Sequence, residues 1–138
     1  MDTLIRFGIS LPKGLSEKFD RLIAVKGYTN RSEAIRDLIR AELVQKEWRD
    51  NKEVAGAVIL IYDHHQRELL DKITDIQHDH QTMIISTQHV HLDHHHCLEI
   101  VAVKGRAAQA QQLADKLRAV KGIKHAALTF SSTGKELP

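Results

Sequence analysis

The stretch from Gln88 to Glu99 holds the residue types best suited to binding a metal ion. It contains Cys97, the one cysteine of the chain, and half of the ten histidines. Side chains alternate between the two faces of a strand, so His89 and His91 share a face and form a chelating pair. The polar residues that follow predict a hairpin loop, after which a second strand returns antiparallel and brings the Cys97 thiol beside both imidazoles.

Two imidazole nitrogens and one thiolate favour a borderline transition metal ion over magnesium or calcium, which require oxygen ligands. Iron, nickel, copper and zinc all stay open at this point. The simpler alternative is a polar sheet face with a solvated loop. A thiol at hairpin distance favours the metal site, because thiolates bind borderline ions well. We expect the loop residues His94, His95 and His96 to face solvent.

Composition excludes some classes of protein but identifies no function. The 138 residues contain no apolar run near the roughly 20 residues of a membrane-spanning helix, and the first residues lack the pattern of a secretory leader. We therefore expect a cytoplasmic protein with no membrane partner. A single cysteine cannot form an internal disulfide, which agrees with a reducing compartment. Because the formal net charge is only +2, any contact with nucleic acid depends on a local basic patch.

Residues Leu4 to Leu11 alternate between polar and apolar side chains, which predicts a half-buried strand. Arg6, Gly8 and Ser10 share its polar face. A strand and two helices are too short to bury an adequate core alone, because domains below about 60 residues are marginal. If two chains pair these strands antiparallel, they form a two-stranded ribbon of the kind that fits the major groove of double-stranded DNA.

Two helices are expected after this strand. Apolar residues at helical spacing predict the first helix from Leu15 until Gly27 stops it. Asn30 is a good N-cap for the second helix, with Glu33 three residues further on as in a capping box. The apolar stripe of that helix runs to about Trp48.

Residues 1–50 resemble the ribbon-helix-helix family of DNA-binding proteins, most clearly in the junction between residues 27 and 37. The resemblance implies that Arg6 and Ser10 contact bases in the major groove. It also implies a phosphate clamp at the start of the second helix, where helix N-termini favour anions, made by Asn30, Arg31 and Ser32. Between the two base readers stands Gly8, where relatives usually carry a side chain able to contact a base. The protein is therefore expected to read fewer bases or a different operator.

A polar segment at residues 51–53 predicts a hinge between a DNA-binding domain at 1–50 and a second domain at 54–132, followed by a tail at 133–138. In the second domain we expect strands at 54–62, 82–92, 97–104 and 123–130, with helices at 65–80 and 106–120. This β-α-β-β-α-β order is that of a ferredoxin-like unit, so the expected fold class is α+β.

A ribbon-helix-helix unit followed by such a domain, with His-Val-His and a cysteine six residues later, resembles the NikR family of nickel-responsive transcriptional regulators. The resemblance covers the chain from about Arg6 to Phe130. It implies an ACT-type regulatory domain, a homotetramer built as a dimer of dimers, and one Ni(II) per subunit in a square-planar site. The implied ligands are His89, His91 and Cys97 from one chain and His78 from a neighbour, with Glu99 as a carboxylate that orients a ligand.

The resemblance also implies how the metal acts. Ni(II) at the interface between regulatory domains favours an arrangement in which both ribbons reach one operator, so the protein is expected to repress nickel-uptake genes. A further cation is implied between the domains at Glu33 and Asp37, although a solvated acidic pair is the simpler explanation. Arg67 is a candidate for an additional phosphate contact. Three more histidines near the site are expected to lie on the surface or to contact a metal ligand without binding the metal: His64, His65 and His80.

Three alternatives stay open. The same residues suit a ribbon-helix-helix repressor that senses copper, cobalt or zinc. The histidine-rich loop suits a metal-buffering protein or a nickel chaperone. An enzyme with Cys97 as nucleophile and His89 or His91 as base is disfavoured, because the N-terminal unit would then have no purpose and no phosphate-binding loop is apparent. We therefore expect no small-molecule substrate.

Overall fold

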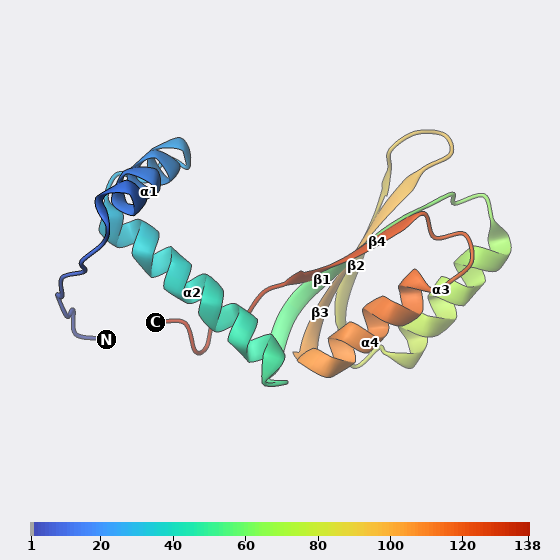
Figure 1. Cartoon of the computed structure of the whole chain (residues 1–138). Helices are drawn as coiled ribbons and strands as arrows, with labels where there is room; N and C mark the ends of the chain where they lie inside the picture. Colours follow the sequence, from blue (N-terminus) through green and yellow to red (C-terminus); the bar gives the residue numbers. More distant parts are fainter. Residues whose placement is uncertain (1) are drawn as a thin grey trace. The chain divides into compact units, whose positions relative to one another are not determined.

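The structure, a computed structural model, describes residues 2–138 and groups them into two units (Figure 1). The first unit comprises the residues up to Leu43 together with Leu137 and Pro138. The second unit comprises Val44–Glu136. None of the helices in the described residues is long and apolar enough to cross a membrane.

The first unit contains helix α1 (Lys13–Val25) and the start of helix α2 (Arg31–Arg49). Gly27, with a φ of 84°, turns the chain between the two helices in the left-handed region that favours glycine. The expected N-cap of α2 is confirmed, because the Asn30 side-chain oxygen accepts a hydrogen bond of 2.9 Å from the Glu33 backbone N–H.

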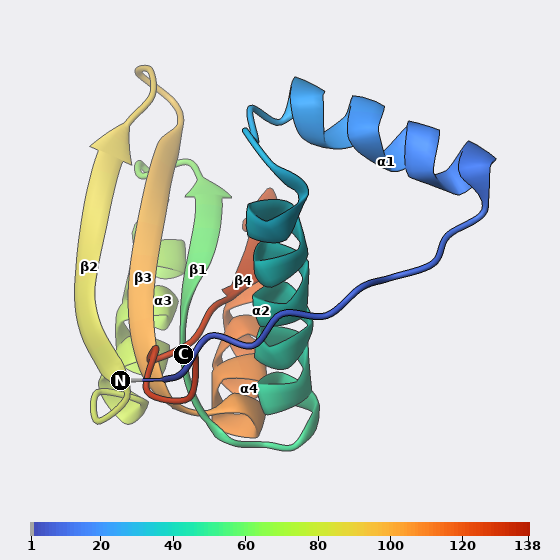
Figure 2. The same cartoon turned by 90° about the vertical axis from the view of Figure 1, so that its left-hand side faces the viewer.

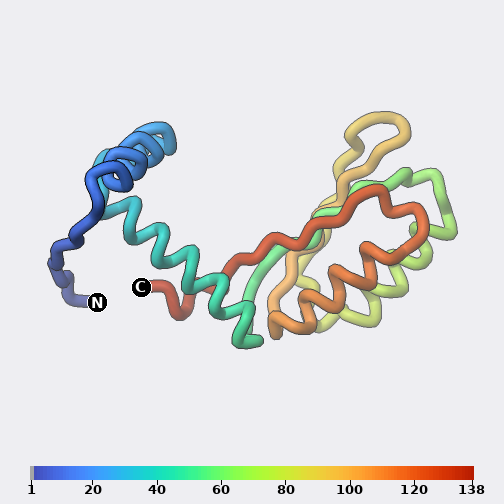
Figure 3. The backbone as a smooth tube through the Cα atoms, in the orientation of Figure 1, coloured from blue at the N-terminus to red at the C-terminus, as the bar shows by residue number. Residues whose placement is uncertain are grey.

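The strand expected over residues 4–11 is not formed in the single chain. Residues 2–12 are neither helix nor strand, and the chain runs through them as an open trace to α1 (Figure 3). Ile5 and Phe7, predicted for the half-buried face, are 83% and 74% exposed. A strand needs a neighbour for its backbone hydrogen bonds, and the described part of the first unit offers none. Periodicity in the sequence therefore predicted a strand that this unit cannot complete by itself.

The first unit buries little apolar surface. Of its described apolar side chains, Ile23 and Ala34 are buried. Many others on its two helices are exposed, namely Leu15, Leu22, Val25, Leu38, Ile39 and Leu43. This exposure agrees with the expectation that so short a unit needs a second copy to complete its core.

The second unit is a four-stranded antiparallel sheet with α3 and α4 on one face (Figure 2). Its strands are β1 (Glu53–Tyr62), β2 (Ile84–His91), β3 (Cys97–Arg106) and β4 (His125–Phe130), and its helices are α3 (Arg67–Asp79) and α4 (Ala107–Arg118). The strands lie in the order β2-β3-β1-β4. The succession β-α-β-β-α-β along the chain, with this strand order, confirms the expected ferredoxin-like fold and α+β class.

Alternate residues of the central strands β1 and β3 are buried and form the core with α3 and α4. Tyr62 of β1 pairs with Cys97 of β3. Two residues away, Leu60 pairs with Glu99. All four side chains are buried, and Leu69 of α3 belongs to the same cluster. The register thus sets a carboxylate among apolar side chains, a position that requires hydrogen-bond partners.

Helix α3 begins later than the sequence predicts, and helix α2 extends into the second unit. Helix α3 begins at Arg67 rather than at His65, because the Asp63 side chain accepts a hydrogen bond of 2.9 Å from the His65 backbone N–H and holds these residues in a turn. Helix α2 ends within the second unit, where Trp48 is buried and stacks on Phe130 with ring centroids 4.2 Å apart.

The residues expected to form a hinge are hydrogen-bonded to the start of α4. The Asn51 side-chain oxygen accepts a hydrogen bond of 2.9 Å from the Ala108 backbone N–H. The Lys52 carbonyl accepts one of 3.0 Å from the Ala107 backbone N–H. Strand β1 begins directly afterwards, at Glu53.

Candidate metal centre

The β2–β3 hairpin positions three of the predicted metal ligands. His91 pairs with Cys97, and His89 pairs with Glu99, in the antiparallel register. Directly opposite residues of an antiparallel pair project from the same face. Cys97 and Glu99 are buried in the core under α3 and α4, so both imidazoles emerge on this side of the sheet. The register agrees with the predicted arrival of the thiol beside the two imidazoles.

The buried carboxylate of Glu99 is held by three side-chain donors. Its exposed fraction is 1%. The Tyr62 hydroxyl donates to Oε1 at 2.6 Å, His89 Nε2 lies 3.0 Å from the same oxygen, and the Gln77 amide donates to Oε2. Burial, and next the hydrogen bond to Glu99, raises the pKa of Tyr62, so its phenol stays protonated as a donor. These contacts satisfy a charge that would otherwise be costly to bury.

His78 lies apart from the hairpin, near the end of α3, and is exposed. It lines a shallow hollow in the surface together with Thr74, Gln81 and Ile84. Its neighbour Gln77 lines the same hollow and also donates a hydrogen bond to Glu99. The single chain therefore presents His78 outward while the preceding residue contacts the hairpin.

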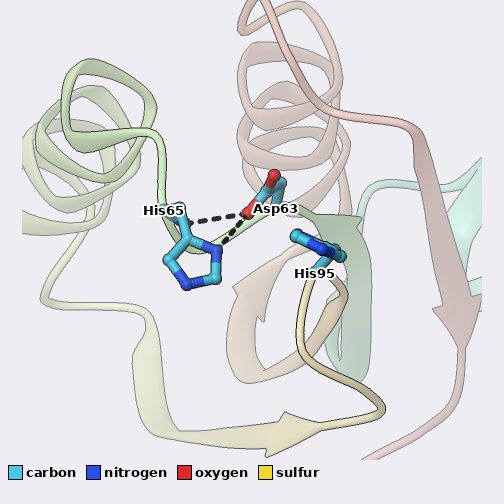
Figure 4. A group of neighbouring side chains, drawn as sticks. All are labelled: Asp63, His65 and His95. Atoms are coloured by element: carbon cyan, nitrogen blue, oxygen red, sulfur yellow. Dashed lines mark hydrogen bonds and ion pairs between the residues drawn. The ribbon is translucent and has the colours of Figure 1, made fainter.

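The four predicted ligands do not form a closed cluster in the single chain. Within residues 2–138, one group of three metal-binding side chains has all its ligand atoms within 4.8 Å of one another, and it is a different one: Asp63, His65 and His95 (Figure 4). Asp63 and His65 come from the loop between β1 and α3, and His95 comes from the tip of the β2–β3 hairpin. Asp63 is not among the functional residues predicted from the sequence.

The Asp63 carboxylate is oriented by the neighbouring histidine. One oxygen, Oδ1, accepts the His65 backbone N–H at 2.9 Å and lies 3.0 Å from His65 Nδ1. The backbone hydrogen bond is the main cause that holds the pKa of Asp63 below its usual range. The sequence did contain a signal for this group, because the Asp-His-His run follows strand β1 at the sheet end where the histidine-rich hairpin loop also emerges.

His64 lies between this group and the hairpin ligands. Its ring centroid is 4.2 Å from that of His65 and 4.6 Å from that of His91. Its Nδ1 is buried without a hydrogen-bond partner. Burial, followed by the neighbouring imidazoles, lowers the pKa of His64, so the neutral form prevails at pH 7.

The other histidines divide into solvated and paired ones. His94 and His95 are exposed, as expected. His96 is half-buried instead, because its Nδ1 lies 2.8 Å from the Asp93 carboxylate and its Nε2 lies 3.0 Å from the Lys124 amine. His80 Nδ1 lies 2.9 Å from a backbone carbonyl one turn earlier in α3.

Six of the predicted DNA-contacting residues lie in the first unit. Arg6, Gly8 and Ser10 are exposed on the open segment before α1, and Asn30, Arg31 and Ser32 are at the start of α2. The guanidinium of Arg31 is already engaged, since its Nε and one terminal nitrogen donate to the Asp20 carboxylate at 2.8 and 2.7 Å. Arg67, the candidate for an extra phosphate contact, is exposed at the start of α3.

The acidic pair on α2 accepts hydrogen bonds within its own unit. Asp37 receives the Tyr28 hydroxyl at 2.6 Å. Glu33 receives the Thr29 hydroxyl at 3.5 Å. Both carboxylates are exposed, which is the arrangement of a solvated acidic pair.

Comparison with known proteins covers both units. Residues 55–131 match the family model described as "NikR C terminal nickel binding domain". Residues 5–46 match the one described as "Ribbon-helix-helix protein, copG family".

Several relatives are similar along nearly the whole chain, and each carries the name "Putative nickel-responsive regulator". The protein from Chlorobium limicola is 58% identical over 134 residues, which is 97% of this chain and 100% of the relative. The one from Syntrophus aciditrophicus is 57% identical over 98% of both chains. The one from Thermococcus kodakarensis is 51% identical over 97% of this chain and 98% of its own length.

Proposed function

This chain belongs to the NikR family, and from that premise we propose that it is a nickel-responsive, DNA-binding transcriptional regulator that represses nickel-uptake genes. The single observation that carries the proposal is the register of the β2–β3 hairpin, which pairs His91 with Cys97 directly beside His89. The family is one of regulators and not a class of enzymes, and the proposal assigns the thiol to metal binding rather than to nucleophilic chemistry.

The proposed nickel ligands from one chain are His89, His91 and Cys97, with one Ni(II) bound per subunit. Two imidazoles and a thiolate fit this ion, which accepts square-planar coordination where zinc resists it. His78 of a neighbouring subunit is the proposed fourth ligand. Its exposure near the end of α3 supports this assignment, because a ligand for another chain must point away from its own. Metal binding and assembly are then one event.

Glu99 sets which nitrogen of His89 is free for the metal. Its carboxylate only accepts hydrogen bonds, so the contact with His89 Nε2 at 3.0 Å places the imidazole proton on that nitrogen. Nδ1 is then unprotonated and able to bind a metal ion. Fixing the tautomer of a ligand in this way raises metal affinity, and the burial of Glu99 by Tyr62 and Gln77 keeps the carboxylate in place.

The open segment over residues 4–11 is the proposed DNA-reading element. Its exposed apolar residues, with Ile5 and Phe7 foremost, support pairing with the same segment of a second chain into a ribbon. Arg6 and Ser10, with Gly8 between them, are then on the ribbon face that enters the major groove. Because Asp20 holds the Arg31 guanidinium, the start of α2 contacts phosphate mainly through backbone N–H groups.

Two DNA-binding dimers joined through their regulatory domains form the proposed homotetramer. The sheet face turned away from α3 and α4 carries half-buried apolar side chains, including Ile59, Ile61, Leu98 and Ile100, and their number supports burial against another subunit. Nickel bound across such an interface favours one arrangement of the two ribbons. Engaging two half-sites together then raises affinity without any contact between metal and DNA.

The test measures binding to the upstream region of the chain's own gene and to nickel-uptake promoters, with and without stoichiometric Ni(II). We expect Ni(II) to tighten binding by tenfold or more, which is about 1.4 kcal/mol of coupling. Cys97→Ala should abolish this gain. His125→Ala is the matched control, because it removes an exposed imidazole on β4 away from the hairpin and should keep the gain.

Equal binding with and without nickel would refute the switch. Parallel titrations with copper, cobalt and zinc separate a nickel regulator from a sensor of another ion. Arg6→Ala tests the remaining alternative, a metal-buffering protein. The substitution should weaken DNA binding if the protein is a regulator, and it should have no effect on the function of a metal buffer.

A further inference from the structure

The residues that follow β4 are held against helix α2 and form a defined segment. We call residues 131–138 the strap. Its first residue continues the sheet, since the Ser131 backbone N–H donates to the Ala55 carbonyl at 3.0 Å. The Ser131 carbonyl accepts a 2.8 Å hydrogen bond from the indole N–H of Trp48, which is buried on α2. The strap is therefore anchored at this end to both the sheet and α2.

The next contact with α2 is weaker. The Ser132 hydroxyl donates to Oε1 of Glu47 at 3.3 Å. Glu47 is half-buried, and its other carboxylate oxygen, Oε2, is buried without a hydrogen-bond partner in the part of the chain that the structure describes. A carboxylate oxygen buried in this way costs free energy. Solvation of the Glu47 carboxylate therefore favours opening of this contact.

The far end of the strap contacts α2 about two turns earlier. Arg40 Nε donates to the Pro138 carbonyl at 3.0 Å, and a terminal nitrogen of Arg40 lies 3.5 Å from the Asp37 carboxylate. Leu137 is half-buried beside this contact in the sequence. Single contacts made by partly exposed side chains are weak. This end is therefore held less firmly than the end beside Trp48.

The strap follows the face of α2 that is shielded from solvent between residues 40 and 48. Arg40, Val44 and Glu47 are half-buried and Trp48 is buried, whereas the residues between them are exposed. This spacing puts all four on one face of a helix. Val44 packs on the core of the second unit, and the other three donate to or accept from the strap.

A turn within the strap matches its length to the helix. Gly134 has a φ of 83°, in the region that favours glycine, and its N–H donates to the Ser132 hydroxyl oxygen at 3.0 Å. At 1.5 Å per residue, Arg40 and Trp48 are about 12 Å apart along α2. The strap could span up to about 23 Å if it were fully extended. The turn takes up the excess, so the strap follows α2 without being stretched.

The strap begins in one unit and ends in the other. Its residues up to Glu136 belong to the second unit, and its last two residues belong to the first, as does their partner Arg40. Helix α2 also passes from the first unit to the second, between Leu43 and Val44. The chain therefore connects the two units twice, once through the helix and once through the strap.

We propose that the strap restricts the movement of the DNA-binding unit relative to the regulatory unit, with a permanent anchor beside Trp48 and a releasable end at Arg40. Its effect on DNA binding rests on the proposed function. Units that are already restricted lose less freedom when two ribbons engage one operator, so the strap tightens binding by the nickel-bound protein. Among the described residues, the side chains of α2 that hydrogen-bond to the strap are neither proposed nickel ligands nor DNA-contacting residues.

The first experiment measures the strap directly, by limited digestion of the full-length metal-free protein with chymotrypsin. This protease cuts after large apolar residues, such as Leu43 and Trp48 on α2. Removal of residues 133–138 should make cleavage there at least about threefold faster, because cleavage follows the population of the opened form. Cleavage after Leu113, which is buried on α4, reports global unfolding and should not change.

Two variants of full length complete this experiment. Gly134→Pro cannot adopt a φ of 83° or donate to Ser132, so it opens the turn and should accelerate cleavage as the deletion does. Glu136→Ala is the matched control, because it removes an exposed side chain of the strap and should leave the cleavage rate at the native value. Circular dichroism of each variant verifies that the fold is retained.

The second experiment compares DNA binding with and without Ni(II) in the same variants. We expect the deletion and Gly134→Pro to keep the native affinity for Ni(II) and to reduce the tightening of DNA binding by nickel from tenfold or more to below about threefold. Glu136→Ala should keep the full gain.

The two experiments separate the possible failures. Unchanged cleavage rates in the deletion and in Gly134→Pro would overturn the strap itself. Faster cleavage with an undiminished nickel gain would overturn its role in DNA binding. If the native protein shows no nickel gain, the proposed function fails, and the cleavage rates still decide whether the strap restrains α2.

Discussion

Replacing Glu99 with methionine tests whether the buried carboxylate orients a nickel ligand. Methionine has nearly the same length and fills irregular space in cores, but it offers no acceptor to His89. The His89 imidazole is then free to rotate and to carry its proton on either nitrogen. Glu99→Gln is the matched control, because its amide oxygen can still accept from Tyr62 and His89 on the side where Glu99 Oε1 now lies. The Gln77 amide can turn over to accept from the new amide group.

The expected magnitudes follow from the contacts of Glu99. Loss of an outer contact to a metal ligand lowers metal affinity about 10- to 100-fold, or about 1.4 to 2.8 kcal/mol, and this is the expectation for Glu99→Met. Glu99→Gln retains the contact to His89 and should lose about tenfold or less, because a neutral acceptor is roughly half as strong as a charged one.

In the metal-free protein, Glu99→Met should lower the free energy of unfolding by less than the loss of three hydrogen-bond contacts suggests. Glu99→Met leaves three donors without their acceptor, but His89 is exposed and Gln77 is half-buried, so water can satisfy both. Only the Tyr62 hydroxyl, in a residue 1% exposed, stays buried without a partner, at a cost of about 1 to 3 kcal/mol. Removal of a buried charge offsets part of that loss.

The assay is competition for Ni(II) against a chelator of known affinity, with urea unfolding of the metal-free variants alongside. Equal affinities for Glu99→Met and the native protein, within about threefold or 0.7 kcal/mol, would refute the orienting role of Glu99. A loss in Glu99→Gln as large as that in Glu99→Met would mean that the charge matters and the contact to His89 does not.

Two further predictions concern stability and titration. Trp48→Ala removes the stack on Phe130 and a 2.8 Å hydrogen bond to the Ser131 carbonyl. Urea unfolding should show a free energy of unfolding lower by about 3 to 5 kcal/mol, and a loss below about 1 kcal/mol contradicts the packing role of Trp48. The Arg31 hydrogen bond lowers the pKa of Asp20 below its ordinary value of 3.8, so this contact stabilises the first unit above that pH and is lost as the pH falls through the lowered pKa. Carboxyl NMR should find the Asp20 midpoint below 3.8 in the native protein and near 3.8 in Arg31→Ala, and equal midpoints would contradict the pairing.

Local chemistry made much of the fold predictable. Asn30 and Glu33 mark a helix start by a hydrogen bond within one turn, and the Gly27 stop needs only its own backbone. Alternation along β2 and β3 was sufficient to put His89 and His91 on the face of Cys97, because the side-chain period of a strand fixes the face once the register is known.

Features that depend on contacts between residues far apart in the sequence, or on another strand, could not be predicted from local sequence patterns. The alternation of residues 4–11 is a strand signal, but a strand forms only beside another strand, and the described part of this unit provides none. The group of Asp63, His65 and His95 depends on where two loops meet, which no spacing within either loop encodes. His96 was misjudged for the same reason, since its partner Lys124 comes from the far end of the domain.

If the first unit pairs with a second copy as proposed, its sparse core ties its folding to protein concentration. Ile23 and Ala34 are its buried apolar residues among those described, so the single copy has little packing to set against the conformational entropy of ordering the unit. A unit that folds only on meeting a second copy has no free energy of unfolding of its own, and mass action links the folded fraction to the number of chains present. Tenfold dilution would then remove about 1.4 kcal/mol per pair, and we expect the first unit to unfold on dilution before the second unit does.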